Sequence, residues 1–193
     1  MKAGHSQSIL TNTLCFILLS SLLFTALSGS SLRAGEIHEA AADGDVETVS
    51  KILTKTQDAL NARDRFGRTP LFIACEKNLT ATAELLLVRG ADPMIRHRNL
   101  STPMHEVAKT GNTILLEQLR AAKADINAAD NDNRKKPIHY AVRNGHMNAV
   151  KWFIENGTDV NAPNKNSWTP LMYAAESGHT DIAAFLLERK ANP

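Results

Sequence analysis

Residues 169–179, Thr-Pro-Leu-Met-Tyr-Ala-Ala-Glu-Ser-Gly-His, decide the fold because versions of this stretch recur along the chain. Its opening triplet has three relatives, which are Thr69-Pro70-Leu71, Thr102-Pro103-Met104 and Lys136-Pro137-Ile138. Successive prolines in these triplets are 33, 34 and 33 residues apart. A turn residue keeps the same register at Gly44, Asn78, Gly111, Gly145 and Gly178. Such a period indicates a repeat protein in which each unit packs only on its neighbours.

Each repeat predicts two short helices. Thr before Pro marks a helix start, because the hydroxyl accepts a hydrogen bond from a free backbone N–H and Pro has no N–H to leave unpaired. The turn Gly, or Asn78, favours a left-handed backbone. A second helix follows with apolar spacing, as in residues 149–154, and an Asp- or Asn-containing loop leads to the next repeat. Lys136 replaces the capping Thr, and Lys123 and Lys190 occupy turns where a side chain is unfavourable.

This pattern resembles the ankyrin repeat, in which Thr-Pro-Leu-His-x-Ala-Ala, Gly-His and Val-x-x-Leu-Leu follow a loop. The resemblance covers residues 36–193 and implies an all-α repeat solenoid of helix-turn-helix units joined by hairpin-like loops. We expect an ankyrin-repeat domain at residues 35–193 with about five units, at residues 36–63, 64–96, 97–129, 130–163 and 164–193. Phe72 and Met172 depart from the family pattern by replacing its histidine.

Residues 1–34 predict a signal peptide. Lys2 is followed by an apolar run at residues 14–27 and then by small residues, which is the secretory pattern. The run is short for a bilayer span, which needs about 20 residues. We expect cleavage between residues 28 and 34 and an exported protein, periplasmic or secreted. An uncleaved membrane anchor and a buried N-terminal helix remain alternatives.

Composition and motifs argue against catalysis and against metal or cofactor sites. The chain is 43% hydrophobic and 22% charged with a net charge of +2, which indicates a globular protein without a strong nucleic-acid-binding charge. His38-Glu39 and His105-Glu106 lack the second His that a zinc helix needs four residues after the first. Residues 130–133, Asp-Asn-Asp-Asn, lack the later Gly and Glu of a calcium loop. After cleavage Cys75 remains as an unpaired thiol, expected in the core.

The repeat register predicts a partner-binding surface made of loop tips and first-helix positions. Aromatic and Arg side chains are enriched in interface hot spots. The candidate residues are Arg65, Phe66, Arg68, Arg98, Leu100, Arg134, Tyr140, Arg143, Trp168 and Tyr173. Two alternatives stay open: Phe66 and Trp168 cover neighbouring loops, or the basic loop edge is an ordinary solvated surface.

The resemblance implies a non-catalytic protein-interaction module with a protein partner and no nucleic acid. A short array behind a signal-like leader resembles small exported bacterial ankyrin proteins. Two alternatives are a secreted effector acting on a host protein and a membrane-tethered scaffold, the latter only if the leader is uncleaved. The C-terminal unit lacks an evident polar cap, so association with a second copy through that unit is also possible.

Overall fold

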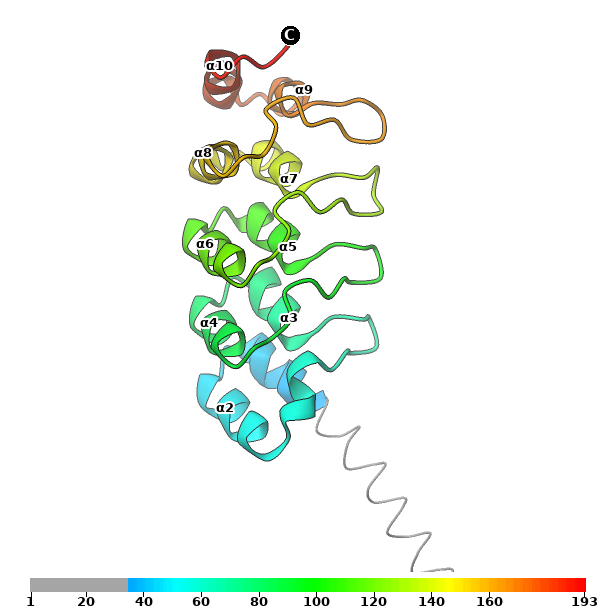
Figure 1. The fold of residues 1–193 in the computed structure, drawn as a ribbon, viewed down its shortest axis with the longest axis vertical. Helices are drawn as coiled ribbons and strands as arrows, with labels where there is room; N and C mark the ends of the chain where they lie inside the picture. The colour runs from blue at the N-terminus through cyan, green and yellow to red at the C-terminus, as the bar shows by residue number, and fades with distance from the viewer. Residues whose placement is uncertain (1–34) are drawn as a thin grey trace, which may run out of the picture.

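The computed structural model describes residues 35–193, and the predicted leader lies outside the described residues. Pairs of antiparallel helices stack along one axis, and hairpin loops project from one side of the stack (Figure 1). After a helix at residues 35–43, the order is α2 (Val46–Lys55), η1 (Gln57–Asn61), α3 (Pro70–Glu76), α4 (Thr80–Val88), α5 (Pro103–Thr110), α6 (Thr113–Ala121), α7 (Pro137–Arg143), α8 (Met147–Glu155), α9 (Pro170–Glu176) and α10 (Thr180–Glu188). The described residues contain no strand, so the predicted all-α solenoid is confirmed.

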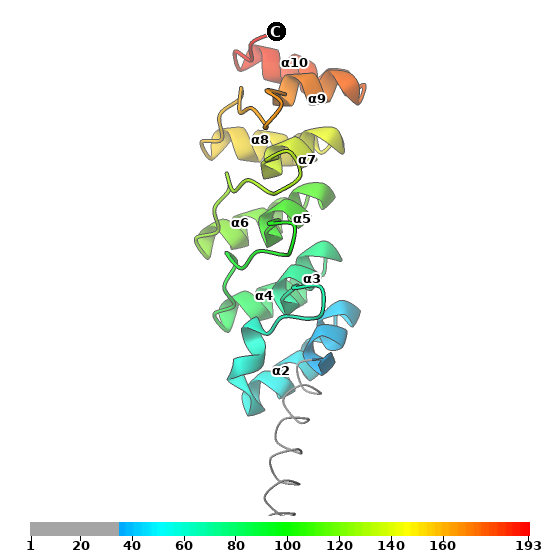
Figure 2. The same cartoon turned by 90° about the vertical axis from the view of Figure 1, so that its right-hand side faces the viewer.

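The helices form two rows. α3, α5, α7 and α9 lie beside the hairpins and make the inner row, whereas α2, α4, α6, α8 and α10 make the outer row (Figures 1 and 2). Buried apolar side chains from both rows form one continuous core, in which Phe153 and Cys75 are fully buried. Burial raises the pKa of the Cys75 thiol, so this cysteine stays protonated and packs as a small apolar residue. Within residues 35–193, no helix has the length and apolar character needed to cross a membrane.

Threonine caps begin two inner helices as predicted. Thr69 Oγ1 accepts a hydrogen bond from the Phe72 N–H at 3.2 Å, and Thr169 Oγ1 accepts one from the Met172 N–H at 3.4 Å. Pro follows each cap at the first helical position. The hydroxyl therefore satisfies an otherwise free donor of the first turn.

At the starts of the other two inner helices, α5 and α7, a histidine side chain accepts a hydrogen bond from the backbone N–H of the cap residue. The Nδ1 atom of His105 accepts from the Thr102 N–H at 3.1 Å, and that of His139 accepts from the Lys136 N–H at 2.9 Å. His139 thus satisfies the Lys136 N–H, but it does not replace the capping hydroxyl, which accepts from the N–H three residues further along the chain. Where Phe72 replaces the histidine, only the threonine hydroxyl caps.

The same two imidazoles tie each inner helix to a loop further along the chain. Because Nδ1 accepts a hydrogen bond, the proton of each neutral ring lies on Nε2. His105 Nε2 donates to the Lys135 carbonyl at 3.2 Å, and His139 Nε2 donates to the Ala162 carbonyl at 2.8 Å. Burial lowers the pKa of both histidines to about 4. Both rings are therefore neutral at physiological pH, which is the form that this bridging geometry requires.

Left-handed turns separate the two helices of each unit. Gly111 and Asn78 have φ angles of 74° and 57°. Lys123 and Lys190 lie in a different turn, after the second helices α6 and α10, and each has a φ of 66°, which is unfavourable for a residue with a side chain, as predicted. His146 and His179, which follow turn glycines, bond through Nε2 to backbone carbonyls of the preceding unit at 2.7 and 3.1 Å. These two imidazoles therefore tie each turn to the unit before it.

Candidate functional site

The hairpins stack into a continuous edge along one side of the solenoid (Figure 1). Backbone hydrogen bonds join them, from the Asn131 N–H to the Asn99 carbonyl at 2.8 Å and from the Lys165 N–H to the Asn133 carbonyl at 2.6 Å. Exposed hairpin side chains on this side define the hairpin edge, which consists of Arg65, Phe66, Arg98, Leu100, Arg134, Lys165 and Trp168. The backbone therefore fixes the spacing between the groups on the second, third and fourth hairpins.

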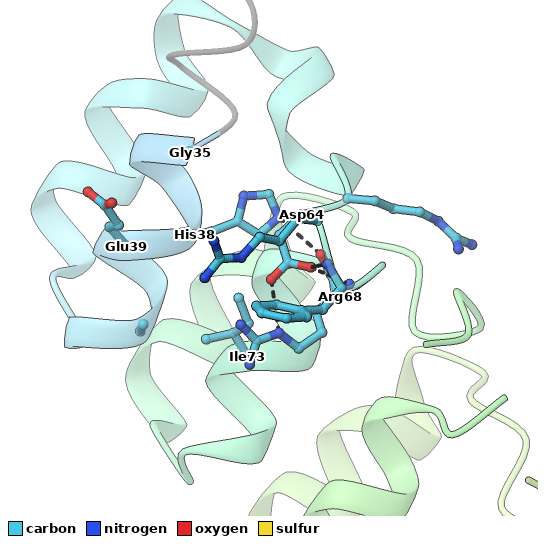
Figure 3. Close-up of a pocket in the computed structure, with 10 residues that line it drawn as sticks. Gly35, His38, Glu39, Asp64, Arg68 and Ile73 are labelled. Carbon is cyan, nitrogen blue, oxygen red and sulfur yellow. Dashed lines mark hydrogen bonds and ion pairs between the residues drawn. The ribbon is translucent and has the colours of Figure 1, made fainter. Parts of the chain in front are cut away.

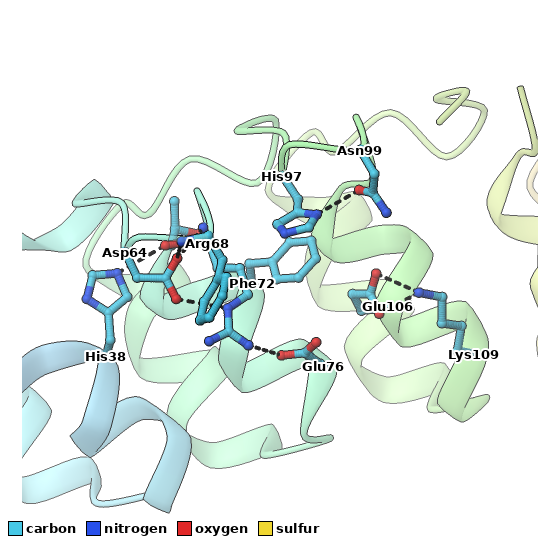
Figure 4. A network of polar contacts seen from close by, with 11 residues as sticks. His38, Asp64, Arg68, Phe72, Glu76, His97, Asn99, Glu106 and Lys109 are labelled. Carbon is cyan, nitrogen blue, oxygen red and sulfur yellow. Dashed lines mark hydrogen bonds and ion pairs between the residues drawn. The ribbon is translucent and has the colours of Figure 1, made fainter. Parts of the chain in front are cut away.

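Phe66 is held in position by its own hairpin. Asp64 Oδ1 accepts from the N–H groups of Phe66 and Arg68 at 2.9 and 2.8 Å, while its Oδ2 pairs with Arg68 Nε at 2.9 Å. Arg68 Nη1 reaches Glu76 of α3 at 2.9 Å (Figure 4). The guanidinium carbons of Arg65 and Arg68 lie 4.7 and 5.0 Å from the Phe66 ring centroid. The ring nevertheless remains 44% exposed, so it is ordered and available for contact.

The charge of Asp64 is fixed by these contacts. Burial alone would raise the pKa of Asp64, but the hydrogen bonds from Arg68 and Phe66 outweigh it and hold the pKa below its usual value. Asp64 and Glu76 together engage Arg68, whereas within residues 35–193 no ion pair includes Arg65, Arg98, Arg134 or Arg143. The hairpin edge therefore presents uncompensated positive charge.

A hollow of about 540 Å³ lies beside Phe66, between the helix at residues 35–43, the first hairpin and α3 (Figure 3). Its lining mixes apolar, acidic and basic groups, contributed by Gly35, His38, Glu39, Ala42, Arg63, Asp64, Arg65, Phe66, Arg68 and Ile73. A concave surface of mixed character suits a protein side chain better than a small apolar ligand.

Tyr140 is half-buried in the middle of the inner row. Its hydroxyl donates to Asp130 Oδ2 at 2.5 Å, and the Nζ atoms of Lys109 and Lys135 lie 5.0 and 5.6 Å from its ring centroid. Burial and the Asp130 carboxylate raise the pKa of Tyr140, so its phenol stays protonated. On the same helix, Arg143 is exposed.

Tyr173 differs from the expectation that it would lie on the binding surface. Its side chain is buried, and its ring contacts Trp168 and His139 at centroid distances of 5.3 Å each. Its hydroxyl accepts from Asn164 Nδ2 at 2.8 Å. The fourth hairpin folds over this ring and covers it. Tyr173 therefore supports Trp168, which is 36% exposed, from beneath.

The first residues of the hairpins organise the site and were missed as site residues. Asp130 Oδ1 accepts from the Lys135 N–H at 2.9 Å, and Asn164 Oδ1 accepts from the N–H groups of Asn166 and Trp168 at 2.8 and 2.9 Å. Asp64 plays the same part in the first hairpin. Their common register, with Asp64, Asp130 and Asn164 at equivalent repeat positions, is the sequence signal that could have found them.

Leu100 stands at the tip of its hairpin with a φ of 62° and is 41% exposed. A left-handed backbone costs a residue with a Cβ about 1 kcal/mol relative to Gly. We expect Leu100→Gly to raise the free energy of unfolding by about 1 kcal/mol in urea denaturation. Leu100→Ala is the control, because it removes the exposed side chain and keeps the unfavourable backbone. An equal gain from both substitutions would contradict backbone strain as the cause.

The described part of the chain offers binding groups along the hairpin edge. Its free cysteine, Cys75, is buried, and no group of three or more His, Cys, Asp or Glu side chains in residues 35–193 could hold a metal ion. What the hairpin edge presents is exposed aromatic and apolar surface beside uncompensated cations. That combination is typical of macromolecular interfaces.

Comparison with known proteins matches the repeat geometry. A family model described as ankyrin repeats (3 copies) matches residues 37–130 and 104–193. Similar proteins include chicken inversin, 34% identical over 60% of this chain and 10% of inversin, and mouse neurogenic locus notch homolog protein 1, 31% identical over 72% of this chain and 6% of that protein. Mouse cyclin-dependent kinase 4 inhibitor B is 35% identical over 64% of this chain and 93% of the inhibitor.

The chain thus matches only a small part of inversin and of the notch homolog, but nearly the whole of the kinase inhibitor. The matched family segments reach from the first described helices to Pro193 and coincide with the stacked helix pairs. This chain belongs to the ankyrin-repeat family.

Proposed function

We propose that the protein is a non-catalytic interaction module that binds a folded protein through its hairpin edge and the adjacent inner helices. Ankyrin repeats are protein-interaction modules, and this supports the mode of binding. The observation that carries the choice of surface is the exposure of Phe66 and Trp168 beside cations without ion-pair partners. Aromatic and Arg groups on a rigid support lose little conformational freedom when a partner binds.

Charge favours a partner with an acidic surface. Successive hairpins expose a cation each, at Arg65, Arg98 and Arg134. The carboxylates of Asp64 and Asp130 instead accept hydrogen bonds from backbone N–H groups of their own hairpins. Uncompensated cations steer an acidic partner toward this side and raise its association rate. Nucleic acid is a poorer fit, because the net charge of the chain is only +2.

Export is part of the proposal and rests on the sequence of residues 1–34. We place the protein in the periplasm or outside the cell, with a protein partner there. A secreted effector acting on a host protein and a membrane-tethered scaffold are the alternatives. Capture from separate extracytoplasmic, membrane and host fractions distinguishes the three, because each places the partner in a different fraction.

The test is affinity capture with the tagged protein and two variants. Phe66→Ser/Trp168→Ser alters the hairpin edge, and Ile114→Ser alters α6 in the outer row, where Ile114 is 63% exposed. We expect one protein to be recovered with the wild type and the Ile114→Ser variant, and its yield to fall at least tenfold with the edge variant. Circular dichroism checks that each variant is folded. Equal recovery of the partner with the wild type and both variants would contradict binding through the hairpin edge.

A further inference from the structure

The third hairpin departs from the others at several adjacent positions. The spacing from Pro103 to Pro137 is 34 residues, so residues 130–136 contain one more residue than the preceding hairpin. Lys136 stands where a capping Thr occurs elsewhere, and Asn133 and Arg134 are consecutive left-handed residues with φ of 59° and 55°. Each departure is locally unfavourable. Such departures concentrated at one place are expected at functional sites.

A hollow of about 280 Å³ lies at this hairpin and the beginning of the next. It is lined by Ala129, Arg134, Lys136, Pro163, Asn164 and Lys165, and we call it the hairpin pocket. Half of these residues are cationic and none carries a carboxylate. Within residues 35–193, no ion pair includes any of the three cations. The pocket therefore brings like charges together without a counter-charge.

The carboxylates of the same hairpin are already engaged elsewhere. Asp130 is buried and accepts the Tyr140 hydroxyl at 2.5 Å, and Asp132 pairs with Lys135 at 2.6 Å. Arg96 adds a further cation, because its Nη1 donates to the carbonyl of Ala129, a lining residue, at 2.9 Å. Positive charge thus remains in excess around the pocket.

The backbone holds the pocket in shape. The Lys165 N–H donates to the Asn133 carbonyl at 2.6 Å and joins the two hairpins beside the cations. Asn164 fixes the fourth hairpin through its side-chain oxygen, which accepts from two backbone N–H groups. The backbone that carries the cationic side chains is therefore already ordered before any ligand arrives, which lowers the entropy lost on binding.

We propose that the hairpin pocket binds a doubly charged tetrahedral oxyanion of the phosphate or phosphomonoester class. A dianion would relieve the repulsion among Arg134, Lys136 and Lys165, and the planar guanidinium matches the spacing of phosphate oxygens. A single carboxylate would compensate less of this charge. The pocket shares Arg134 and Lys165 with the hairpin edge but includes neither Phe66 nor Trp168, so phosphate binding is tested apart from the capture of a protein partner.

The first experiment titrates the whole protein with inorganic phosphate, keeping ionic strength constant with chloride, and follows backbone amide chemical shifts by NMR. We expect saturable shifts at Asn133, Arg134 and Lys165. The double variant Arg134→Gln/Lys165→Gln should weaken phosphate binding at least tenfold. Arg98→Gln, which removes an exposed cation from another hairpin, should leave it unchanged. Shifts that stay linear, or saturation that is equal in the double variant, would overturn the site.

A second arm identifies the source of the phosphate group. A short peptide carrying one phosphoserine is compared with its unphosphorylated form and with inorganic phosphate. Binding of the phosphopeptide at least tenfold tighter than inorganic phosphate supports a group carried by a partner protein, and equal binding supports a free anion. Equal binding of the two peptides, together with no saturable effect of inorganic phosphate, overturns the proposal.

Lys136→Thr provides a variant that should fold better and bind worse. Restoring the capping hydroxyl is expected to raise the melting temperature in chloride. Loss of the third cation is expected to reduce phosphate affinity several-fold. A higher melting temperature of Lys136→Thr, together with unchanged phosphate affinity in both Lys136→Thr and Arg134→Gln/Lys165→Gln, would show that Lys136 is only a poor cap. That result would overturn phosphate binding by the pocket.

Discussion

Acidification from pH 7 to pH 5 is expected to lower the free energy of unfolding by about 4 kcal/mol through two buried histidines. The pKa of His105 and of His139 is about 4 in the folded protein, below the usual 6.5. Unfolding therefore takes up protons in this range, and stability falls as pH drops from about 6.5 toward 4. Each histidine contributes about 2 kcal/mol of the change between pH 7 and pH 5.

Burial and nearby cations lower the pKa of both rings and outweigh the hydrogen bonds to backbone carbonyls, which raise it. Burial is the main cause of each lowered pKa, and the charges of Lys109 and Arg96 at His105, and of Lys136 and Lys135 at His139, lower it further. Protonation of Nδ1 would also turn the acceptor of a backbone N–H into a donor. Asp130, whose pKa is raised chiefly by burial, acts in the opposite direction as its carboxyl takes up a proton.

Urea denaturation at pH 7, 6 and 5 measures the effect. His105→Gln/His139→Gln should be less stable than the wild type at pH 7, because the ring contacts are lost, yet its stability should change much less between pH 7 and pH 5. Parallel pH profiles for the two proteins would show that other groups cause the acid sensitivity.

Gly111→Ala is expected to destabilise the protein by about 3 kcal/mol. Gly111 has a φ of 74°, and a Cβ added there would lie 2.5 Å from His146 Cγ. The left-handed backbone contributes about 1 kcal/mol of the penalty. The rest comes from displacement of the His146 ring, whose Nε2 bonds to the Lys109 carbonyl at 2.7 Å.

Gly178→Ala is the matched control for this substitution. Gly178 has nearly the same φ, 73°, but a Cβ there would meet nothing within 4 Å. We expect it to cost about 1 kcal/mol, from the backbone alone. Thermal or urea unfolding of the two variants separates the backbone penalty from the cost of displacing the His146 ring. Equal losses of stability would show that the turn of the third unit tolerates the clash by moving the histidine.

The helices and turns could be predicted from the sequence because their determinants are local. Thr69 and Thr169 cap the helices they precede, and Lys123 and Lys190 adopt the left-handed turn that their register requires. Cys75 could also be placed, since its helix face is apolar. In each case a short segment and the period suffice to specify the outcome.

The candidate surface was less predictable because exposure depends on what the hairpins cover. Tyr140 and Tyr173 are in equivalent positions near the start of α7 and α9, yet Tyr173 is buried and Tyr140 is only half-buried. The two hydroxyls bond to equivalent hairpin residues, Asp130 and Asn164, so the difference comes from Trp168, which packs on the Tyr173 ring. Repeat register gives the direction of a side chain but not the path of the loop above it.

The most direct measurement of the proposed role is the affinity of the captured partner, by isothermal titration calorimetry, for the wild type and two variants. Phe66→Ser/Trp168→Ser should bind at least tenfold more weakly, and Ile114→Ser in the outer row should bind within twofold of the wild type. Unchanged affinity of the edge variant, or a loss confined to Ile114→Ser, would contradict protein recognition by the hairpin edge.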